Sequence, residues 1–342
     1  MSNFLTYLCA TAARLFLMGM LLWSALLVLP QAQFFGNLLF LTEGARAFPS
    51  IFLICSGITL AIIGAYGFQY RRGDSVLTLL AICFALGFQI RRAPEFYLPV
   101  LAKPAQVSRS PALSIVVANV ELGRADGKRL FLNLQNELPD VLVVTEITPS
   151  WIEQSNVRSY YPHRVEYPDL YAAGTAIYTK RPLKERAVRG APDFFNSIVA
   201  TLNDEDGQEV WLIAVHAPPP SFDLDLQQRE KYFQLVSELR QLAPIEASVV
   251  VAGDFNATPF SESFKSLLAR ERFVDAAAGM FLPSTWQHKY VGAFLDHVLL
   301  SGYSSQGSFR VLDDFGSDHF PVSVKLFPVS DISRTKGNVT NS

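Results

Sequence analysis

Gly253-Asp254-Phe255-Asn256 ends one apolar run of this sequence, and Ser317-Asp318-His319 begins another. Either tract alone is compatible with an ordinary turn, because Gly, Asp, Asn and Ser are the residues that favour turns. Both tracts, however, place carboxylate or imidazole groups at the end of a strand-like segment. In a sheet-based domain, loops at strand ends hold functional groups over a rigid scaffold.

The same placement recurs along the chain. Polar residues end or open four further apolar runs: Asn119 after 114–118, Glu146 after 141–145, His216 after 211–215, and Asp296 at the start of 296–300. A lone acid after a strand is more often a turn or cap residue, so Glu146 or Asp296 alone indicates little. Together these residues supply hard oxygen ligands and titratable bases. Such a set suits Mg²⁺ or Mn²⁺, whereas the absence of cysteine beyond Cys83 excludes a thiolate zinc site.

Short β-branched runs dominate the second part of the chain and predict strands. They cover 113–117, 141–145, 173–179, 197–202, 209–215, 248–252, 296–300, 308–312 and 321–326. Helices are expected at about 224–242, capped by Ser221, and after Ser261. Many strands mixed with few helices predict an α+β domain of two packed sheets flanked by helices.

The motifs together resemble the endonuclease/exonuclease/phosphatase superfamily, which has the DNase I-like fold. The resemblance covers about 114–326, with the tracts in the family's order: Asn119, Glu146, the Gly174-Thr175-Ala176-Ile177 strand, His216, Gly253-Asp254-Phe255-Asn256, Asp296 and Ser317-Asp318-His319. It implies a four-layer α/β/β/α sandwich of two packed mixed sheets. The apolar N-terminal part is similar to that of a bacterial membrane-anchored subgroup.

The resemblance also implies roles for these residues. Glu146 would bind Mg²⁺, with Asn119 and Asp318 close by, and Mn²⁺ is a possible substitute. His319, oriented by Asp296, would be the general base, and Asp254 is the rival base. Asn256 would donate to a phosphate oxygen, and His216 would contact the phosphate or assist the leaving group. His163, His288 and His297 are expected to be structural or surface residues.

The N-terminal part of the chain is strongly apolar. Residues 47–70 contain no charged side chain, and 15–29 form a second apolar run after Arg14. A third run, 75–90, has only 16 residues and relies on Arg91 and Arg92 reaching the interface. We therefore expect about three transmembrane helices in 1–93, with an uncleaved first span favoured over a signal peptide.

This pattern predicts four segments: a membrane domain at 1–93, a Pro-rich linker at 94–112, a catalytic domain at 113–328 and a polar tail at 329–342. The first segment would place the protein as a multi-pass protein of the cell membrane, most plausibly the bacterial inner membrane. Basic residues flank the spans on both faces, so the side on which the catalytic domain lies stays open. The sequence indicates no protein partner.

Charge bears on the substrate. Up to Arg109 there are eight basic and three acidic residues, which leaves 21 basic and 28 acidic residues and a net charge of −7 beyond it. A protein that grips duplex nucleic acid through many phosphates usually shows the opposite balance. The one basic cluster, Lys180, Arg181, Lys184, Arg186 and Arg189, fits a solvated hairpin better than a substrate path.

The sequence therefore predicts a membrane-anchored, Mg²⁺-dependent hydrolase of phosphate esters, most simply a phosphodiesterase of the nuclease type. A phosphatase or phosphodiesterase acting on a lipid headgroup or small molecule is the enzymatic alternative, so the substrate stays open between nucleic acid and lipid headgroup. A catalytically inactive interaction module is the alternative from another class. Binding alone would not require Glu146, Asp254, Asp296 and His319 together.

Overall fold

The computed structural model describes residues 108, 110–134, 137–189, 196–219, 223–280, 284–289 and 291–329. The chain divides into two compact units, one of Val100–Pro219 with Gln227–Ser342 and one of Met1–Pro99 with Pro220–Leu226. All described sheets belong to the first unit. The predicted spans in 1–93, most of the linker and the tail lie outside the described residues. Among the residues described, no helix is long and apolar enough to cross a membrane.

One sheet of the domain is built around its first two strands. β1 (Leu113–Asn119) runs parallel to β2 (Val141–Thr145) and antiparallel to β15 (Val322–Pro328). The full order is β13-β15-β1-β2-β4-β3, with β14 also paired to β15. The other strands are β3 (His163–Tyr167), β4 (Thr175–Thr179), β13 (Tyr303–Ser304) and β14 (Arg310–Val311).

The second sheet is built around β7 and β8 in the same manner. β7 (Glu209–His216) runs parallel to β8 (Ser248–Asp254), and β8 runs antiparallel to β12 (Asp296–Ser301). The order is β5-β6-β7-β8-β12-β9. Its remaining strands are β5 (Lys184–Arg189), β6 (Ser197–Asn203) and β9 (Val274–Asp275). A separate hairpin pairs β10 (Trp286–His288) with β11 (Val291–Ala293).

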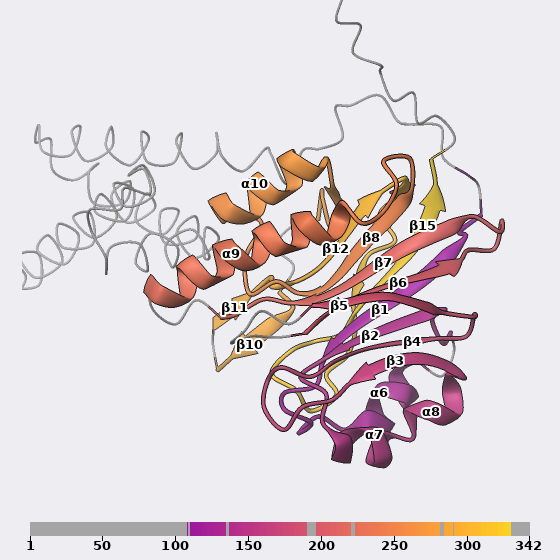
Figure 1. Ribbon diagram of the computed structural model, residues 1–342. Helices are drawn as coiled ribbons and strands as arrows, with labels where there is room; N and C mark the ends of the chain where they lie inside the picture. Colours follow the sequence, from indigo (N-terminus) through magenta and orange to yellow (C-terminus); the bar gives the residue numbers. More distant parts are fainter. Residues whose placement is uncertain are drawn as a thin grey trace, which may run out of the picture. The chain divides into compact units, whose positions relative to one another are not determined.

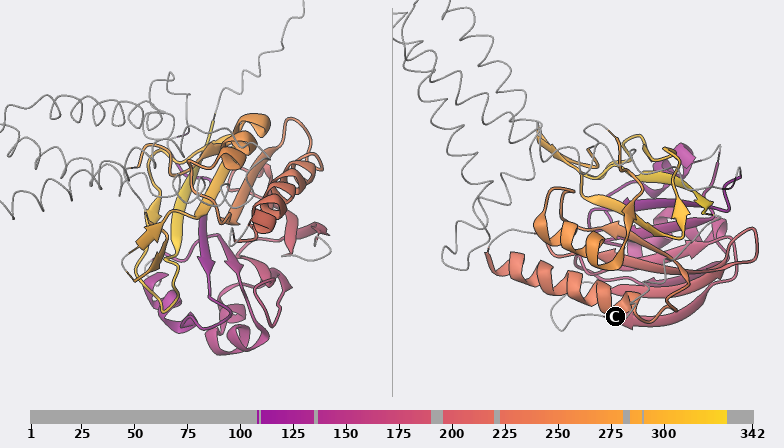
Figure 2. Two further views of the ribbon diagram at one scale, coloured as in Figure 1. Left: turned by 90° about the vertical axis from the view of Figure 1, so that its left-hand side faces the viewer. Right: turned by 90° about the horizontal axis from the view of Figure 1, so that it is seen from above.

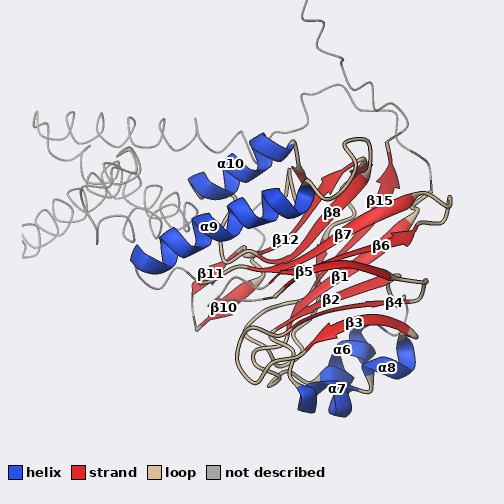
Figure 3. Ribbon diagram, viewed as in Figure 1, coloured by secondary structure: helices blue, strands red, loops and turns tan. Residues whose placement is uncertain are grey.

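Helices cover the outer faces of the two sheets (Figures 1 and 3). α9 (Asp223–Arg240) and α10 (Glu262–Glu271) lie on the second sheet, while α6 (Gly127–Leu134), α7 (Pro149–Ser155) and α8 (Val157–Tyr160) lie on the first. The strands of the two sheets lie between these helix layers, as the views in Figure 2 also show. The predicted pair of packed mixed sheets with flanking helices is confirmed.

Side-chain alternation explains why the sheets have apolar faces on both sides. In β7, Ile213 and Val215 pack under the helices with Phe233 of α9. Leu212 and Ala214 alternate with them and are fully buried, facing the other sheet. A strand buried on both faces reads as a continuous hydrophobic run, which is why these strands were recognisable in the sequence.

The structure corrects several details of the predicted elements. The run 308–312 forms only a two-residue strand, because the Ser308 hydroxyl bonds both backbone groups of Lys325 in place of strand pairing. Ser261 holds the N-cap position of α10 but makes no capping hydrogen bond, and its hydroxyl instead pairs with that of Ser263 at 3.0 Å. Ser221 lies outside the described residues.

Gly253 is the backbone position on which the alignment of β7 and β8 depends. Its φ of +151° is rare for residues with a side chain, and an added Cβ would collide with the carbonyl oxygen of Val215. The register pairs Val215 with Gly253 and His216 with Asp254. Only glycine lets the two strands approach closely at this point.

We expect Gly253→Ala to lower the free energy of unfolding by about 3 kcal/mol, since the new methyl group must displace a buried strand. Chemical denaturation of the purified full-length protein measures this change. Gly207→Ala is the matched control, because Gly207 also has a positive φ, +79°, but nothing lies within 4 Å of the added Cβ. Equal losses in the two variants would show that backbone strain, and not the close approach, matters at Gly253.

Candidate active site

The polar residues singled out from the sequence meet at one edge of the two sheets. Parallel pairing places the ends of β1 and β2 together and the ends of β7 and β8 together. The start of β12 joins them, because Asp296 pairs directly with Asp254 in the antiparallel register. Asp318 and His319 precede β15, which is antiparallel to β1. The structure therefore brings these residues together at a single rim.

Asp254 lies at the centre of this cluster and is 1% exposed. Its Oδ2 atom accepts a hydrogen bond from Asn119 Nδ2 at 3.1 Å. The same oxygen lies 3.7 Å from His216 Nε2 and 3.6 Å from His319 Nε2. Burial raises the pKa of Asp254, and the neighbouring His319 and His216 act in the opposite direction. This carboxylate thus contacts nitrogen groups from three separate segments of the chain.

His319 is held from both sides by carboxylates. Its Nδ1 donates to Asp296 Oδ2 at 2.9 Å, which turns Nε2 toward Asp254. Burial alone would lower the pKa of His319, but Asp296 and Asp254 outweigh it and raise the pKa to about 10. In this arrangement His319 retains a proton at neutral pH.

Asp296 is itself fixed by a residue that sequence reasoning missed. The buried hydroxyl of Thr285 accepts the backbone N–H groups of Leu295 and Asp296 at 2.9 and 3.0 Å. The second carboxylate oxygen of Asp296, Oδ1, is buried and has no hydrogen-bond partner among the described residues. A buried carboxylate with an oxygen left over is costly unless charge nearby compensates it, and His319 supplies that charge.

Glu146 sits directly after β2 in a strained conformation. Its φ of 59° is unusual for a residue with a side chain. Residues in such strained conformations are found more often at functional sites than elsewhere. Asn119 Nδ2 donates to Oε1 at 3.0 Å, and the backbone N–H of Leu122 donates to Oε2 at 2.9 Å. Burial raises the pKa of Glu146, and Asp318 raises it further, whereas the Asn119 hydrogen bond lowers it.

His216 is buried and held by two hydrogen bonds. Its Nδ1 donates to the carbonyl oxygen of Ala172 at 3.0 Å, and its backbone N–H donates to the hydroxyl of Tyr232 at 2.9 Å. Nε2 then lies 3.7 Å from both Glu146 Oε1 and Asp254 Oδ2. Burial lowers the pKa of His216, which favours a neutral ring with its Nε2 lone pair toward the cluster.

Asn256 is less available than the sequence suggested. Its side-chain Nδ2 donates to the carbonyl oxygen of Ala217 at 2.8 Å, and its backbone N–H donates to Asp254 Oδ1 at 2.8 Å. The buried Arg229 donates to its carbonyl oxygen at 2.8 Å. With φ at 45°, Asn256 shapes the turn after β8. A phosphate oxygen would have to replace the Ala217 contact to be bound by this amide.

Asp318 is positioned by two groups that the sequence did not single out. The indole Nε1 of Trp286 donates to Asp318 Oδ2 at 2.9 Å, and the backbone N–H of Asp318 donates to Glu121 Oε2 at 3.1 Å. Glu121 follows Asn119 by two residues at the same strand end, which is the sequence pattern that would have found it. Trp286 belongs to the separate β10–β11 hairpin, and no local pattern indicates its contact.

The donor atoms here fit a hard divalent cation. Glu146, Asp254 and Asp318 bring three carboxylates together, and burial makes the charged form of the first two costly without a neighbouring cation. By spacing alone, Asp254, Asp296 and His319 form a candidate metal group, with ligand atoms within 4.8 Å of one another. The arrangement favours the Glu146 and Asp318 side, because Nδ1 of His319 already bonds Asp296 and the raised pKa of His319 keeps a proton on Nε2, which then cannot bind a cation. Both polar atoms of Asn119 are likewise engaged, since its Oδ1 accepts the N–H of Glu121.

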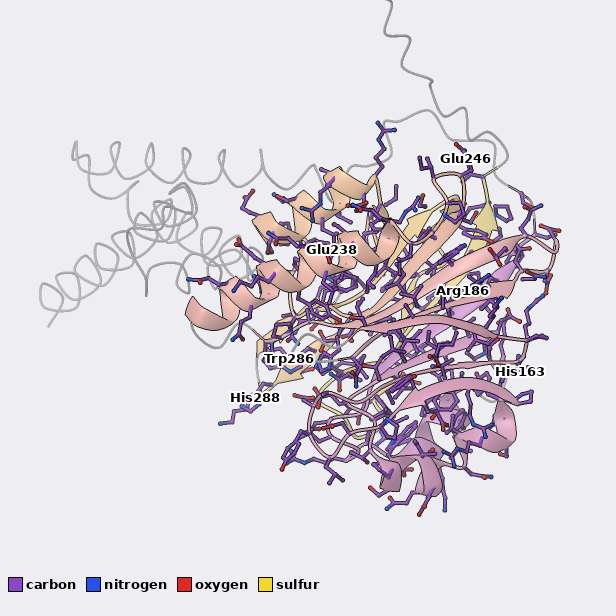
Figure 4. The ribbon with its side chains drawn as sticks, viewed as in Figure 1. His163, Arg186, Glu238, Glu246, Trp286 and His288 are labelled. Atoms are coloured by element: carbon purple, nitrogen blue, oxygen red, sulfur yellow. The ribbon has the colours of Figure 1, made fainter. Side chains whose placement is uncertain are left out.

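The remaining histidines lie outside this cluster, as expected. Both ring nitrogens of the buried His297 are bonded, Nδ1 to Asp275 at 2.6 Å and Nε2 to the carbonyl oxygen of Ala257 at 2.9 Å. His288 is exposed, and its ring stacks on Trp286 with centroids 6.3 Å apart. Figure 4 shows His288 and Trp286 on one side of the domain and His163 on the other.

Arg181, Lys184 and Arg186 of the basic cluster lie at the opposite end of the second sheet, whereas Arg189, at the other end of β5, pairs with Ser197 in the register. Arg186 pairs with Glu209 at 2.7 Å, at the start of β7, whereas His216 ends that strand. Arg181 pairs with Glu205 at 3.1 Å. Arg181, Lys184 and Arg186 line a hollow of about 470 Å³ between β5 and β6. Paired arginines far from the acidic cluster support the interpretation as a solvated hairpin.

Comparison with solved structures agrees with this fold. The humanized D. rerio TDP2 is 20% identical, with a TM-score of 0.50 over 63% of this chain and 98% of that one. SmcL is 16% identical, with the same TM-score and coverage. A UPF0294 protein of Vibrio cholerae serotype O1 is 31% identical over 135 residues. That match covers 38% of this chain and only 44% of the relative's length.

A model of the Endonuclease/Exonuclease/phosphatase family matches residues 116–319. The matched segment begins within β1 and ends at His319, so it contains every residue of the cluster described above. It also covers more than half of the 342 residues. The chain therefore belongs to the endonuclease/exonuclease/phosphatase family.

Proposed function

We propose that this protein is a Mg²⁺-dependent hydrolase of phosphate diesters, with a nuclease-like activity. The observation that carries the proposal is the series of contacts from Asp296 through His319 to Asp254. His216 Nε2 lies 3.7 Å from the same Asp254 oxygen and 3.7 Å from Glu146 Oε1. A binding module has no need for two aspartates around one buried histidine. The cost of burying these charges is consistent with a catalytic role.

Glu146 and Asp318 would hold the cation, and Asn119 would keep Glu146 and Asp254 apart by donating to both. A bound divalent cation would supply neutralisation of the phosphate charge and of the charge that develops during hydrolysis. Trp286 and the Leu122 N–H fix the orientation of the two ligand carboxylates. The carboxylate oxygens of Glu146 and Asp318 are therefore held in position before substrate binds.

The proton of the attacking water would be handled between His319 and Asp254. Nε2 of His319 and Oδ2 of Asp254 face each other at 3.6 Å, so a water placed between them would pass its proton to Asp254, while the charged His319 would balance the negative charge that develops on the phosphate. Asp296 fixes the His319 ring and stabilises its charged form. His216, whose Nε2 borders Glu146 and Asp254, would contact the phosphate or assist the leaving group. Asn256 would bind a phosphate oxygen after releasing Ala217.

We further propose that residues 1–93 anchor this enzyme in the cell membrane. The charge-free stretch 47–70 and the apolar runs on either side of it support this proposal. A lipid headgroup is the alternative substrate, because an anchored enzyme would meet it readily. Assaying the protein against a single-stranded oligonucleotide, a duplex, a phospholipid and a chromogenic diester separates these substrates.

His319→Ala and Glu146→Ala should each lower Mg²⁺-dependent hydrolysis of a chromogenic phosphodiester by at least about 100-fold. The first variant removes the group between two carboxylates, and the second removes a cation ligand. Steady-state turnover of the full-length protein in detergent measures the loss. His163→Ala, on the far side of the domain, serves as the control. Near-normal turnover in either variant would remove that residue from the site.

Trp286→Phe should raise the Mg²⁺ concentration needed for half-maximal activity by about 10-fold, because Asp318 loses the indole donor that orients it. A Mg²⁺ titration of turnover measures the shift. Trp211→Phe is a matched control, since it also removes an indole hydrogen bond to a carboxylate, that of Glu209. If the control shifts equally, the effect of Trp286 is not specific to the cation ligands.

A further inference from the structure

The loop between β3 and β4, residues 168–174, carries the two most prominent apolar side chains near the cluster. Leu170 is 77% exposed and Tyr171 is 78% exposed. Large apolar side chains on a surface loop usually fold back onto the domain or mark a contact site. These two adjacent residues point into solvent on a loop that the catalytic residues themselves touch.

Hydrogen bonds fasten this loop at both ends. Asp169 N–H donates to the carbonyl oxygen of Ile147 at 3.0 Å, and Ile147 N–H donates to that of Gly174 at 3.3 Å. An added Cβ at Gly174 would collide with the Ile147 carbonyl oxygen, so the two segments are in close contact. Because Ile147 directly follows Glu146, the loop is fixed beside the proposed cation ligand.

The middle of the loop is fastened to the histidine side of the cluster. The carbonyl oxygen of Ala172 accepts the His216 Nδ1 hydrogen at 3.0 Å. The Tyr171 N–H donates to Asp169 Oδ1 at 2.6 Å, and Asn196 N–H donates to the carbonyl oxygen of Ala173 at 3.3 Å. Leu170 and Tyr171 are thus presented by an ordered backbone that bonds His216 and Ile147, the residue after Glu146.

An ordered loop that exposes apolar groups is prepared for binding, because most of the backbone entropy is lost before the ligand arrives. A phosphate held at Glu146 and His216 would bring the group attached to it against Leu170 and Tyr171. A third apolar side chain, that of Leu122, is 37% exposed. The backbone N–H of Leu122 donates to Oε2 of Glu146. All three apolar side chains therefore lie on segments whose backbone bonds Glu146, its neighbour Ile147 or His216.

We propose that Tyr171, supported by Leu170, is the contact surface for a nucleobase attached to the phosphate that is cleaved. This proposal rests on the proposed phosphodiesterase function and names its substrate class: a nucleotide-type diester or strand end with few phosphates. A flat base stacks on an aromatic ring whichever of the bases it is, because every base has a π-face. The net charge of −7 beyond Arg109 disfavours a long polyanion, whereas one base and one phosphate need no extended basic groove.

A bilayer surface fits this loop less well. Two side chains offer little apolar area for insertion, and Asp169 directly precedes them. Acidic residues near an anionic membrane surface oppose binding.

Two chromogenic diesters with the same leaving group test the contact: thymidine 5′-(4-nitrophenyl) phosphate and methyl 4-nitrophenyl phosphate. For the full-length protein with Mg²⁺, Tyr171→Ala should raise KM for the thymidine ester about 10-fold. The KM for the methyl ester should stay unchanged, and Tyr171→Phe should behave as the unaltered protein. Ile245→Ala is the matched control, because Ile245 is 81% exposed and lies before β8, at the end away from Asp254.

The outcomes distinguish the contact from the activity. If the unaltered protein cleaves neither diester, the proposed function fails and the base contact with it. If it cleaves both and Tyr171→Ala weakens both equally or neither, the function stands and the base contact is overturned. A loss in Tyr171→Ala confined to phospholipid vesicles would overturn it in favour of a membrane surface. Thermal melting of each variant confirms that the fold is kept.

Discussion

The buried carboxylate of Asp254 is the constraint on which the rest of this site depends. A charge at 1% exposure is tolerable only if hydrogen-bond donors and opposite charge surround it. Asn119 comes from the first sheet, His216 from the neighbouring strand and His319 from the segment before β15. Satisfying one carboxylate therefore requires both sheets to be packed together and correctly aligned. Folding and assembly of the site are the same event.

The scaffold meets this requirement through strand pairing. Parallel pairs β1–β2 and β7–β8 bring four strand ends to one rim, and the antiparallel strands β12 and β15 add their starting residues to it. Helices cover the outer faces, so that each sheet is buried on both sides. The rim is then the part of the domain where polar groups can gather without breaking a hydrophobic layer.

The sequence predicted this part of the molecule well for a physical reason. Strands buried on both faces appear as long apolar runs, and a polar residue at the end of such a run is conspicuous, as at Glu146 and Asp254. Thr285 and Trp286 could not be found in this way, because their contacts to Asp296 and Asp318 join segments that no local pattern connects. The short helices α7 and α8, of seven and four residues, are likewise too brief to show a helical period.

Two kinds of residue lie at the rim: the polar groups around Asp254 and the exposed pair on the loop between β3 and β4. The groups that surround Asp254 sit at the ends of strands, and strand pairing leaves them little freedom. Leu170 and Tyr171 lie on a loop, where a change of side chain disturbs neither sheet nor cluster. Yet the loop cannot drift, since Ala172 bonds the same His216 that faces Asp254. Under the proposed function, exchanging these two exposed residues would change what the site recognises and leave the groups around Asp254 as they are.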